Sequence, residues 1–474
     1  MSGMTGHTQQ SCDFFVRNPI YETLIRCDWP LFSRENGYFI YYHAFYLPPA
    51  VISKLISGFN QSILLWDIIL MLWSYAGIVL CLLLLHRRFK NYIFIFLFLW
   101  IFFDSFAPFG KKLFDSVAYR IEINNMLQPG AISSWWNMAL TKHVGTTSQL
   151  YYTYNHAIPI WIIGAWLVST LGPIEPCTAD VRKKNLFSVP LVISLGVLCS
   201  PFGSAGILVL TVFLLAAAWK NQPFSLLRFL FSPPMLAGLA IVLCAILYFA
   251  CSAGGESRML WSDSKWDTTP DASKRMVSYV LSLACAFVFP LLILRKEYWN
   301  SPLGWTAITC AVIFPLTFVG LINNELLFKS SIIFFLCVTC LLCEQWKVST
   351  FKGKTVIVVG VLLTSYSPLL QFINAFSTFG FSKQAIARNV DNSWKGHLNH
   401  PHESVNKHVY HQFWGTGIPP FFYRVSGESA HGLLCWCATG NRADTEELPP
   451  ANHRQNANDS LGLKREPPAD ANKK

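Results

Sequence analysis

Long apolar runs, separated by shorter polar stretches, follow one another along the chain from Ile63 to Phe372. An apolar run of about 20 residues is typical of a membrane-spanning helix. Several runs are shorter, so we expect them to borrow flanking residues or to be shielded by neighbouring helices. The pattern predicts an all-α polytopic membrane protein whose transmembrane domain covers residues 58–375. We expect ten transmembrane helices, over residues 63–85, 91–109, 156–171, 186–200, 203–219, 235–251, 276–294, 305–322, 329–346 and 355–373.

Lysine and arginine are concentrated in every second loop of this pattern. The loops between the basic ones are either nearly uncharged or long, and the long ones cover residues 110–155 and 252–275. Short loops rich in lysine and arginine stay in the cytoplasm. We therefore expect the two long loops, and the chain after residue 373, at the outer face of the membrane. The short basic loops lie at residues 86–90, 182–184, 220–228, 295–296 and 347–354.

The first apolar segment, GYFIYYHAFYLPPAVISKLISG (residues 37–58), differs from the runs that follow it. Two adjacent prolines in its middle remove two backbone donors, and four tyrosines precede them. Tyrosine favours the headgroup level of a membrane, and the apolar residues around Lys54 have amphipathic helical spacing. We expect residues 38–57 to form an interfacial helix on the outer leaflet, which places residues 1–37 outside. A kinked spanning helix is the alternative, and it would place the N-terminus in the cytoplasm.

Composition supports a membrane protein and argues against several other classes. The 474 residues are 53% hydrophobic and 13% charged, whereas a soluble domain carries about 25% charged residues. Much of the net charge of +11 lies in the short basic loops, so it does not indicate a nucleic-acid partner. Most of the 14 cysteines lie inside apolar runs, where they act as small apolar side chains. We therefore expect no disulfide framework.

The chain changes character after the last apolar run. We expect residues 376–440 to be a polar outer tail, and residues 441–474, which are rich in proline, asparagine and charge, to be disordered. Five histidines lie between His397 and His411. Such a cluster either binds a transition metal or forms a solvated surface, and its spacing matches no zinc template.

Ionisable side chains inside a membrane are costly, so each is a candidate functional residue. Asp67 and Asp104 are expected at the same depth, about one turn from the outer ends of their helices, and His156 begins a helix at that face. Lys329 lies at the outer end of another helix and is a candidate phosphate ligand, with Glu325 beside it. The structural alternatives are helix-packing groups for the two aspartates, a helix cap for the histidine and an interfacial anchor for the lysine.

Three more candidates belong to the same face if residues 38–57 are interfacial. Asp28 and Glu35 are candidate catalytic acids, and Arg34 is a second candidate phosphate ligand. Asp28 precedes a Trp-Pro pair, so a turn residue is the structural alternative. A base, a cation for phosphate and an apolar surface are what a lipid-linked substrate requires. We expect the base, the cation and the apolar surface to lie at the same face of the membrane.

Three stretches of the chain carry a resemblance to a known superfamily. CDWPLFSRENGYFIYYHAFYLPPAVISKLISGFNQSILLWDIIL resembles the first outer loop and following helix of the polytopic GT-C glycosyltransferases, where an acidic residue precedes a Tyr/Pro-rich interfacial helix. TTSQLYYTYNHAIPIW and NNELLFKSS resemble later elements of an uncharacterised bacterial branch. The similarity covers about residues 20–375. Such proteins normally have a membrane helix before the acidic loop, and no apolar run stands there in this sequence.

The resemblance implies transfer of a sugar from a polyprenyl-phosphate carrier to a cell-envelope acceptor at the outer face of the membrane. The protein would then be a multi-pass protein of the bacterial inner (plasma) membrane. An acidic residue would act as base or bind a divalent metal ion, and basic residues would hold the carrier phosphate. The implied partners are a lipid-linked sugar donor and membrane lipids, with no nucleic acid.

Three other functions fit the residue pattern. A transporter or flippase of lipid-linked saccharides would need polar groups at the membrane midplane, where this sequence has few. A saccharide polymerase or ligase would more typically use clustered arginines in its outer loops, and these do not cluster here. A non-enzymatic membrane scaffold is the third alternative.

Overall fold

The structure is a computed structural model that describes most of the apolar part of the chain. The described residues are 14–26, 29, 31–33, 37–57, 63–106, 110, 143, 145–172, 179–221, 224–250, 257–259, 272–319, 324–377 and 414–415. The candidate residues Asp28, Arg34 and Glu35 lie outside these ranges, as do the histidine-rich stretch and residues 441–474. The prediction of a disordered end therefore stays a prediction.

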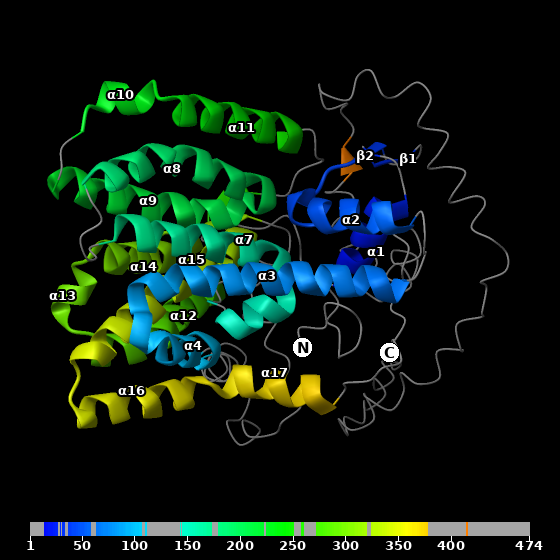
Figure 1. Cartoon of the computed structure of the whole chain (residues 1–474). Helices are drawn as coiled ribbons and strands as arrows, with labels where there is room; N and C mark the ends of the chain where they lie inside the picture. Colours follow the sequence, from blue (N-terminus) through cyan, green and yellow to red (C-terminus); the bar gives the residue numbers. More distant parts are fainter. Residues whose placement is uncertain are drawn as a thin grey trace, which may run out of the picture.

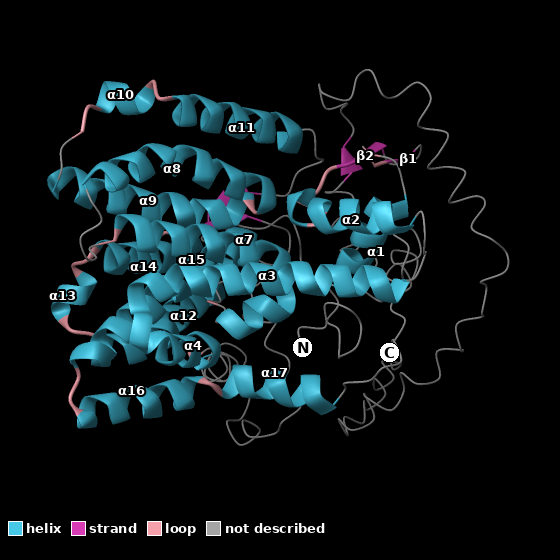
Figure 2. Cartoon of the chain, viewed as in Figure 1, coloured by secondary structure: helices cyan, strands magenta, loops and turns pink. Residues whose placement is uncertain are grey.

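Helices make up nearly all of the described chain (Figure 2). The bundle consists of α3 (Ile63–Phe89), α4 (Ile93–Phe102), α7 (Thr146–Leu171), α8 (Ala179–Cys199), α9 (Pro201–Asn221), α11 (Pro233–Ala250), α12 (Ala272–Ile293), α14 (Pro302–Val312), α15 (Glu325–Val348), α16 (Phe351–Thr364) and α17 (Tyr366–Ser377). Short helices between them are η2 (Lys90–Tyr92), α10 (Leu226–Leu230), α13 (Lys296–Trp299) and η5 (Phe314–Leu316). The N-terminal elements are α1 (Phe14–Arg26), β1 (Phe32–Ser33), β2 (Gly37–Phe39), η1 (His43–Phe45) and α2 (Leu47–Ser57).

The remaining strands are very short and form two small sheets. β5 (Trp414–Gly415) adds to the β1–β2 hairpin, with Tyr38 opposite Gly415. β3 (Ser257–Met259) pairs with β4 (Thr317–Val319), so that Arg258 lies opposite Phe318. These strands have two or three residues each, so the helical bundle is the framework of the fold, as the all-α prediction expected.

One helix, α15, forms the centre of the bundle. In its most apolar 18-residue stretch 89% of the residues are buried, because α4, α7, α9 and α14 pack around it. The helix α11 lies at the rim, where it packs mainly on α8, and only 11% of its corresponding stretch is buried (Figure 1). Its leucines at 236, 239 and 243 are more than half exposed. Helices of this second kind present the apolar surface that a lipid bilayer would cover.

Five candidate spans are long and apolar enough to cross a membrane, or six if the bent pair α16–α17 is one span. This finding is consistent with a membrane protein but does not confirm ten spans. The helices α4 and α14 have 10 and 11 residues, and the first turns of α8 carry Arg182, Lys183 and Lys184. One candidate, Leu64–Phe102, contains α3 and α4, which are separated by η2, where Lys90 has a φ of 30°.

Two predicted boundaries are wrong at the start of the bundle. Residues 146–155 were expected in an outer loop, but they form the first turns of α7. Residues 91–109 were expected to form a spanning helix, but α4 ends at Phe102, and residues 103–106 are not helical. Hydropathy misplaces the start of α7 because its first turns are polar side chains that are buried by protein rather than by lipid.

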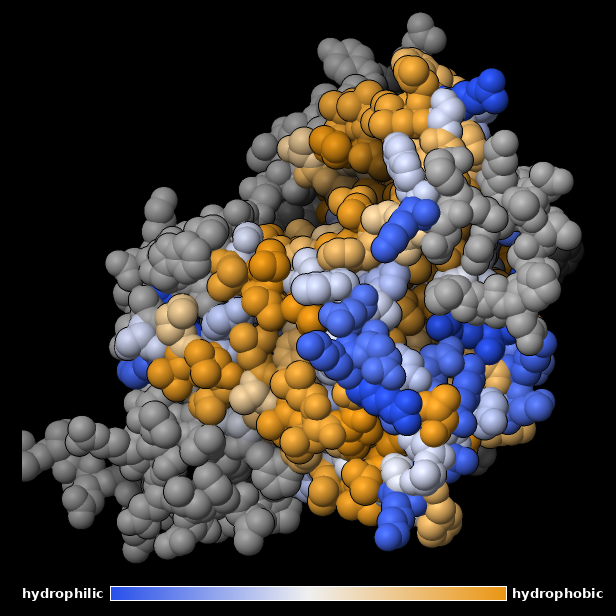
Figure 3. Space-filling model, turned by 90° about the vertical axis from the view of Figure 1, so that its left-hand side faces the viewer, coloured by the Kyte–Doolittle hydropathy of each residue, from blue (hydrophilic) through white to orange (hydrophobic). Residues whose placement is uncertain are grey.

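The loops rich in lysine and arginine meet at one end of the bundle. Figure 1 shows α10, α13 and the turn between α15 and α16 at its left-hand end, where α3 and α9 also finish. Figure 3 faces this end and shows hydrophilic residues gathered among hydrophobic ones. The elements α1, α2, β1 and β2 lie at the opposite end (Figure 1). This arrangement agrees with the loop pattern of the sequence, and the orientation in a membrane stays a prediction.

The expected interfacial helix is shorter than predicted and packs against α3. Residues 37–39 form a strand, and α2 begins only at Leu47, so that the two prolines lie in its first turn, where no backbone donor is needed. One side of α2 is buried through Ala50 and Ser53, while Leu55 on another side is 70% exposed. At 11 residues, or about 16 Å, α2 is too short to cross a membrane. It runs alongside the N-terminal end of α3 (Figure 1).

The helix α1 was not anticipated from the sequence. Its residue Tyr21 donates from the phenol oxygen to the carbonyl of Trp66 at 3.0 Å and is 2.8 Å from the hydroxyl of Ser53. The guanidinium of Arg26 lies 4.9 Å from the centre of the Trp66 ring. These contacts join α1, α2 and the first turns of α3 into one unit at the end of the bundle opposite the basic loops.

Candidate functional site

Lys329 and Glu325 form an ion pair in the first two turns of α15. The helix begins at Asn324, whose side-chain oxygen accepts the N–H of Leu327 at 3.2 Å. Glu325 in the first turn is favoured by the helix dipole, and its side chain reaches the ammonium group of Lys329. The Lys329 side chain is 7% exposed and that of Glu325 is 38% exposed. A nearly buried cation is therefore neutralised by an acid that still contacts solvent.

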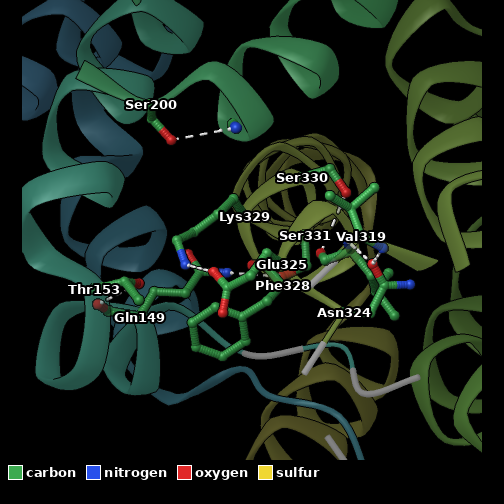
Figure 4. Close-up of polar contacts among 12 residues, drawn as sticks. Gln149, Thr153, Ser200, Val319, Asn324, Glu325, Phe328, Lys329, Ser330 and Ser331 are labelled. Carbon is green, nitrogen blue, oxygen red and sulfur yellow. Dashed lines mark hydrogen bonds and ion pairs between the residues drawn. The ribbon is translucent and has the colours of Figure 1, made fainter. Parts of the chain in front are cut away.

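Polar residues of α7 face this ion pair. Figure 4 shows Gln149 reaching from α7 toward Lys329 and Glu325, with Thr153 next to it on the same helix. The amide of Gln149 donates to the hydroxyl of Ser331 on α15 at 3.4 Å, and the hydroxyl of Thr153 donates to the Gln149 carbonyl at 3.1 Å. The side chains of Gln149, Thr153 and Ser331 are buried. The two helices thus share a polar contact within an otherwise apolar bundle.

The helix α7 is interrupted at this polar contact. Thr153 has φ of −142° and ψ of 36°, which are not helical values. Pro159 lies six residues further on, and a proline removes the hydrogen bond to the carbonyl four residues before it, that of Asn155. The side chain of Asn155 is fully buried, and neither of its polar atoms has a hydrogen-bond partner among the described residues. Irregular backbone and unsatisfied polar groups at membrane depth are typical of functional positions.

Aromatic side chains from three helices, α7, α9 and α11, surround Tyr42. The ring centre of Tyr42 lies 5.1 Å from that of His156, 5.4 Å from Phe249 and 6.5 Å from Phe202. Burial raises the pKa of the Tyr42 phenol well above its ordinary value, and the negative charge of Glu325 raises it further. The phenol therefore stays protonated and lies close enough to Glu325 to be influenced by its charge. Tyr248 holds this segment in place by bonding the backbone N–H and carbonyl of Tyr41 at 3.3 and 3.4 Å.

We refer to Tyr42, Gln149, Thr153, His156, Glu325 and Lys329 as the Lys329 cluster. Two of these residues, His156 and Lys329, were predicted from the sequence; the ring of His156 lies against that of Tyr42, and Lys329 pairs with Glu325, whose charge acts on Tyr42. Gln149 and Thr153 were missed because they stood in an expected loop. The cluster lies at the end of the bundle opposite the basic loops (Figure 1). It offers a cation, a carboxylate, an imidazole and aromatic surface.

Asp104 lies apart from this cluster and holds the start of α7. Its Oδ1 accepts the N–H of Ser105 at 2.7 Å and that of Gly145 at 2.9 Å, while the hydroxyl of Ser148 lies 3.5 Å from Oδ2. Gly145 is the residue before α7, and a Cβ atom there would lie 2.4 Å from the Asp104 carboxyl carbon. The carboxylate thus satisfies backbone donors at the positive end of a helix. This geometry supports the structural alternative for Asp104.

His143 extends the polar contacts around Asp104. Its carbonyl accepts the hydroxyl of Ser105 at 3.2 Å, and its Nδ1 lies 3.1 Å from the hydroxyl of Ser282 on α12. Burial lowers the pKa of His143 to about 4, so the ring is neutral at pH 7. The side chain of Gln371 on α17 donates to Ser148 at 2.9 Å. These bonds tie α4, α7, α12 and α17 together.

Asp67 belongs to a third place in the fold. It lies on α3 next to Trp66, whose carbonyl accepts the Tyr21 hydroxyl from α1. Asp67 lies near the start of α3 and Asp104 follows the end of α4, and the start of α3 extends beyond the end of α4 (Figure 1). The depth of the two acids in a membrane stays a prediction. The four predicted candidates that the structure describes therefore occupy three separate positions.

A metal site is not formed by the residues that the structure describes. Within the described ranges no group of three or more histidine, cysteine, aspartate or glutamate side chains could hold a metal ion. The cysteines 337, 340 and 343 of α15 are buried and unbridged. A divalent ion at Asp28 or Glu35, or at the histidine-rich stretch, would lie outside the described residues.

The chain was also compared with known proteins. No family model, no curated protein and no solved structure matches it, so the resemblance to GT-C glycosyltransferases rests on the sequence stretches alone.

Proposed function

We propose that the protein is a membrane glycosyltransferase of GT-C type. It would move a sugar from a polyprenyl-phosphate-linked donor to a cell-envelope acceptor at the outer face of the bacterial inner membrane. The observation that carries this proposal is the Lys329 cluster, in which a nearly buried cation lies beside a carboxylate and an aromatic surface. It lies at the bundle end opposite the basic loops, which is the outer end if those loops are cytoplasmic.

Each part of the Lys329 cluster matches one part of such a donor. The ammonium group of Lys329 would hold the carrier phosphate, because phosphate and ammonium form strong charge-assisted hydrogen bonds. The rings of Tyr42 and Phe249 would pack against the sugar, and the exposed apolar surface of the neighbouring helices would hold the prenyl tail. His156, whose ring meets that of Tyr42, is a candidate proton acceptor.

The acids of the first loop complete the proposed mechanism. Asp28 and Glu35 precede Tyr42 by 14 and 7 residues in the sequence. These acids are therefore connected to the Lys329 cluster by a short stretch of chain. In the proposal one of them deprotonates the acceptor hydroxyl or binds a divalent ion, and Arg34 assists Lys329. Asp104 and Asp67 have no part in the reaction.

The test is transfer of labelled sugar from polyprenyl-phosphate donors in isolated membranes. Lys329→Met removes the charge but keeps the length of the side chain, and a lost charge-assisted hydrogen bond costs about 1.5–3 kcal/mol. We expect kcat/KM for the donor to fall by about 10- to 100-fold, mainly through KM. Lys347→Met is the matched control, since Lys347 lies on the same helix and also pairs with a glutamate, Glu344, but at the opposite end.

Two outcomes would contradict the proposal. Equal losses in Lys329→Met and Lys347→Met would show that only the stability of α15 is affected. No transfer by the unaltered protein with any polyprenyl-phosphate donor would remove the assignment itself. Asp28→Asn serves as a second variant, for which we expect kcat to fall by about 10²- to 10⁴-fold if Asp28 is the base.

Transport of a lipid-linked saccharide is the second candidate function. It is favoured by one observation, the interruption of α7 at Thr153 beside the buried side chain of Asn155. Interrupted membrane helices with polar groups at the break form the substrate sites of many transporters. Movement of a fluorescent lipid-linked saccharide across proteoliposomes, without any sugar transfer, would favour this function over the first.

A further inference from the structure

We propose that Glu325 occupies the position of the substrate phosphate on Lys329 and leaves it when the anionic donor binds. This inference deepens the proposed function and rests on it for the identity of the donor. It makes Glu325 a residue that gives way to an anionic headgroup, rather than a permanent counter-ion.

Lys329 requires an anion at all times. Its side chain is 7% exposed, and it lies in the second turn of α15, close to the positive end of the helix dipole. Both burial and this dipole disfavour a positive charge, so an unpaired ammonium group here would be costly. The phenyl ring of Phe328, whose centre is 4.9 Å from the ammonium nitrogen, compensates only in part.

Glu325, in contrast, does not require Lys329. Its side chain is 38% exposed, so its carboxylate can turn into solvent at little cost. Its place in the first turn of α15 keeps it favoured by the helix dipole whether or not it contacts the lysine. The pair is therefore asymmetric, because only the lysine needs its partner. An incoming anion can replace Glu325 without leaving a buried charge unpaired.

The surroundings of the pair fit such an exchange. The negative charge of Glu325 acts on the phenol of Tyr42 and helps to keep it protonated. Gln149 reaches toward the ion pair from α7 (Figure 4). The sugar-linked donor is a phosphodiester with one negative charge, and the polyprenyl phosphate that remains after sugar transfer is a monoester with a charge of about −1.5 to −2 at pH 7. Both form charge-assisted hydrogen bonds with an ammonium group, and the monoester competes more strongly with a single carboxylate for the lysine. A neutral lipid does not displace Glu325.

Binding of farnesyl phosphate to the purified full-length protein in detergent tests the inference. Glu325→Gln removes the competing charge, and a partly exposed ion pair contributes up to about a factor of five in affinity. We expect the Kd for farnesyl phosphate to fall by about three- to fivefold in Glu325→Gln, and the Kd for uncharged farnesol to stay unchanged. In Lys329→Met the Kd for farnesyl phosphate should rise by at least about tenfold. Glu344→Gln, in the ion pair at the other end of α15, is the matched control and should behave like the unaltered protein.

The opposite results would overturn the inference. An unchanged or higher Kd in Glu325→Gln would make Glu325 a permanent counter-ion, and so would an equal gain in Glu344→Gln. If neither the unaltered protein nor Glu325→Gln binds farnesyl phosphate, the position next to Lys329 does not take a prenyl phosphate. If Glu325→Gln is not recovered in folded form, Glu325→Asp is measured in the same way, since it keeps the charge at the helix start but shortens the reach to Lys329.

The inference and the proposed function can fail separately. Sugar transfer by the unaltered protein, together with an unchanged Kd in Glu325→Gln, would refute the inference alone. Tighter binding in Glu325→Gln without any sugar transfer would refute the proposed function and leave the exchange at Lys329 in place.

Discussion

Replacement of Asp104 by alanine should destabilise the protein strongly, whereas replacement by asparagine should not. Oδ1 of Asp104 accepts two backbone N–H groups, those of Ser105 and Gly145, and the side chain is only 3% exposed. Alanine leaves both donors buried without this acceptor. Each such loss costs about 1–3 kcal/mol, so the free energy of unfolding should fall by about 2–6 kcal/mol.

Asparagine keeps the acceptor. A carbonyl oxygen has two lone pairs and can take both N–H groups as the carboxylate does. What Asp104→Asn loses is the negative charge near the start of α7 and the 3.5 Å contact with Ser148. A charge at a helix terminus contributes about 0.3–1 kcal/mol, so the expected loss is about 1 kcal/mol.

The assay is unfolding of the purified protein in mixed micelles by increasing mole fractions of sodium dodecyl sulfate, followed by tryptophan fluorescence. Sugar transfer is measured on the same samples. The reasoning is refuted if Asp104→Asn is as unstable as Asp104→Ala, or if the alanine variant is as stable as the unaltered protein. A folded Asp104→Asn that has lost all transfer would return Asp104 to the candidate catalytic residues.

Two further predictions concern pH and topology. The pKa of His143 is lowered to about 4 by burial, against about 6.5 in the unfolded chain, so its contribution to stability is complete above pH 6.5 and is lost as the pH falls to 4. We expect a loss of at most about 3 kcal/mol over this range, which His143→Gln should abolish; equal pH profiles for both proteins would contradict the assignment. Single cysteines placed at 60, 183 and 400 in a cysteine-depleted protein should react with an impermeant thiol reagent in intact cells at 60 and 400 only. Reaction at 183 but not at 60 would reverse the orientation and move the Lys329 cluster to the cytoplasmic face.

The part of the fold that the sequence predicts is the part that follows from local composition. The apolar runs and the alternation of basic loops are both local signals, and the structure has helices over those runs with the basic loops at one end. The start of α7 could not be found in this way, because Gln149 and Thr153 are polar but buried by protein. The packing of α1 depends on bonds from Tyr21 to Ser53 and Trp66, which lie 32 and 45 residues away in the sequence.

The candidate site was predictable only in part, for the same reason. Lys329 and His156 stood out because charged and polar side chains are rare in apolar runs. Their convergence depends on Tyr42, which the sequence presented as one of several interfacial tyrosines. Asp104 attracted the same interpretation as Lys329, although its carboxylate is used for backbone hydrogen bonds. The sequence identifies a charged side chain that is unfavourable in an apolar run, but only the three-dimensional contacts show which groups pair with that charge.

The central position of α15 has a consequence for how the protein is made. The helices that enclose it, α4, α7, α9 and α14, all precede it in the sequence, so they leave the ribosome first. The polar side chains of Lys329, Ser330 and Ser331 near one end of α15 are poorly stabilised by lipid. They are stabilised better by contacts with helices that are already in place. The chain order thus supplies the space before the helix that fills it. A ribosome stalled before residue 325 would leave an assembly with an open centre, which is the form that quality-control proteases of the membrane would remove.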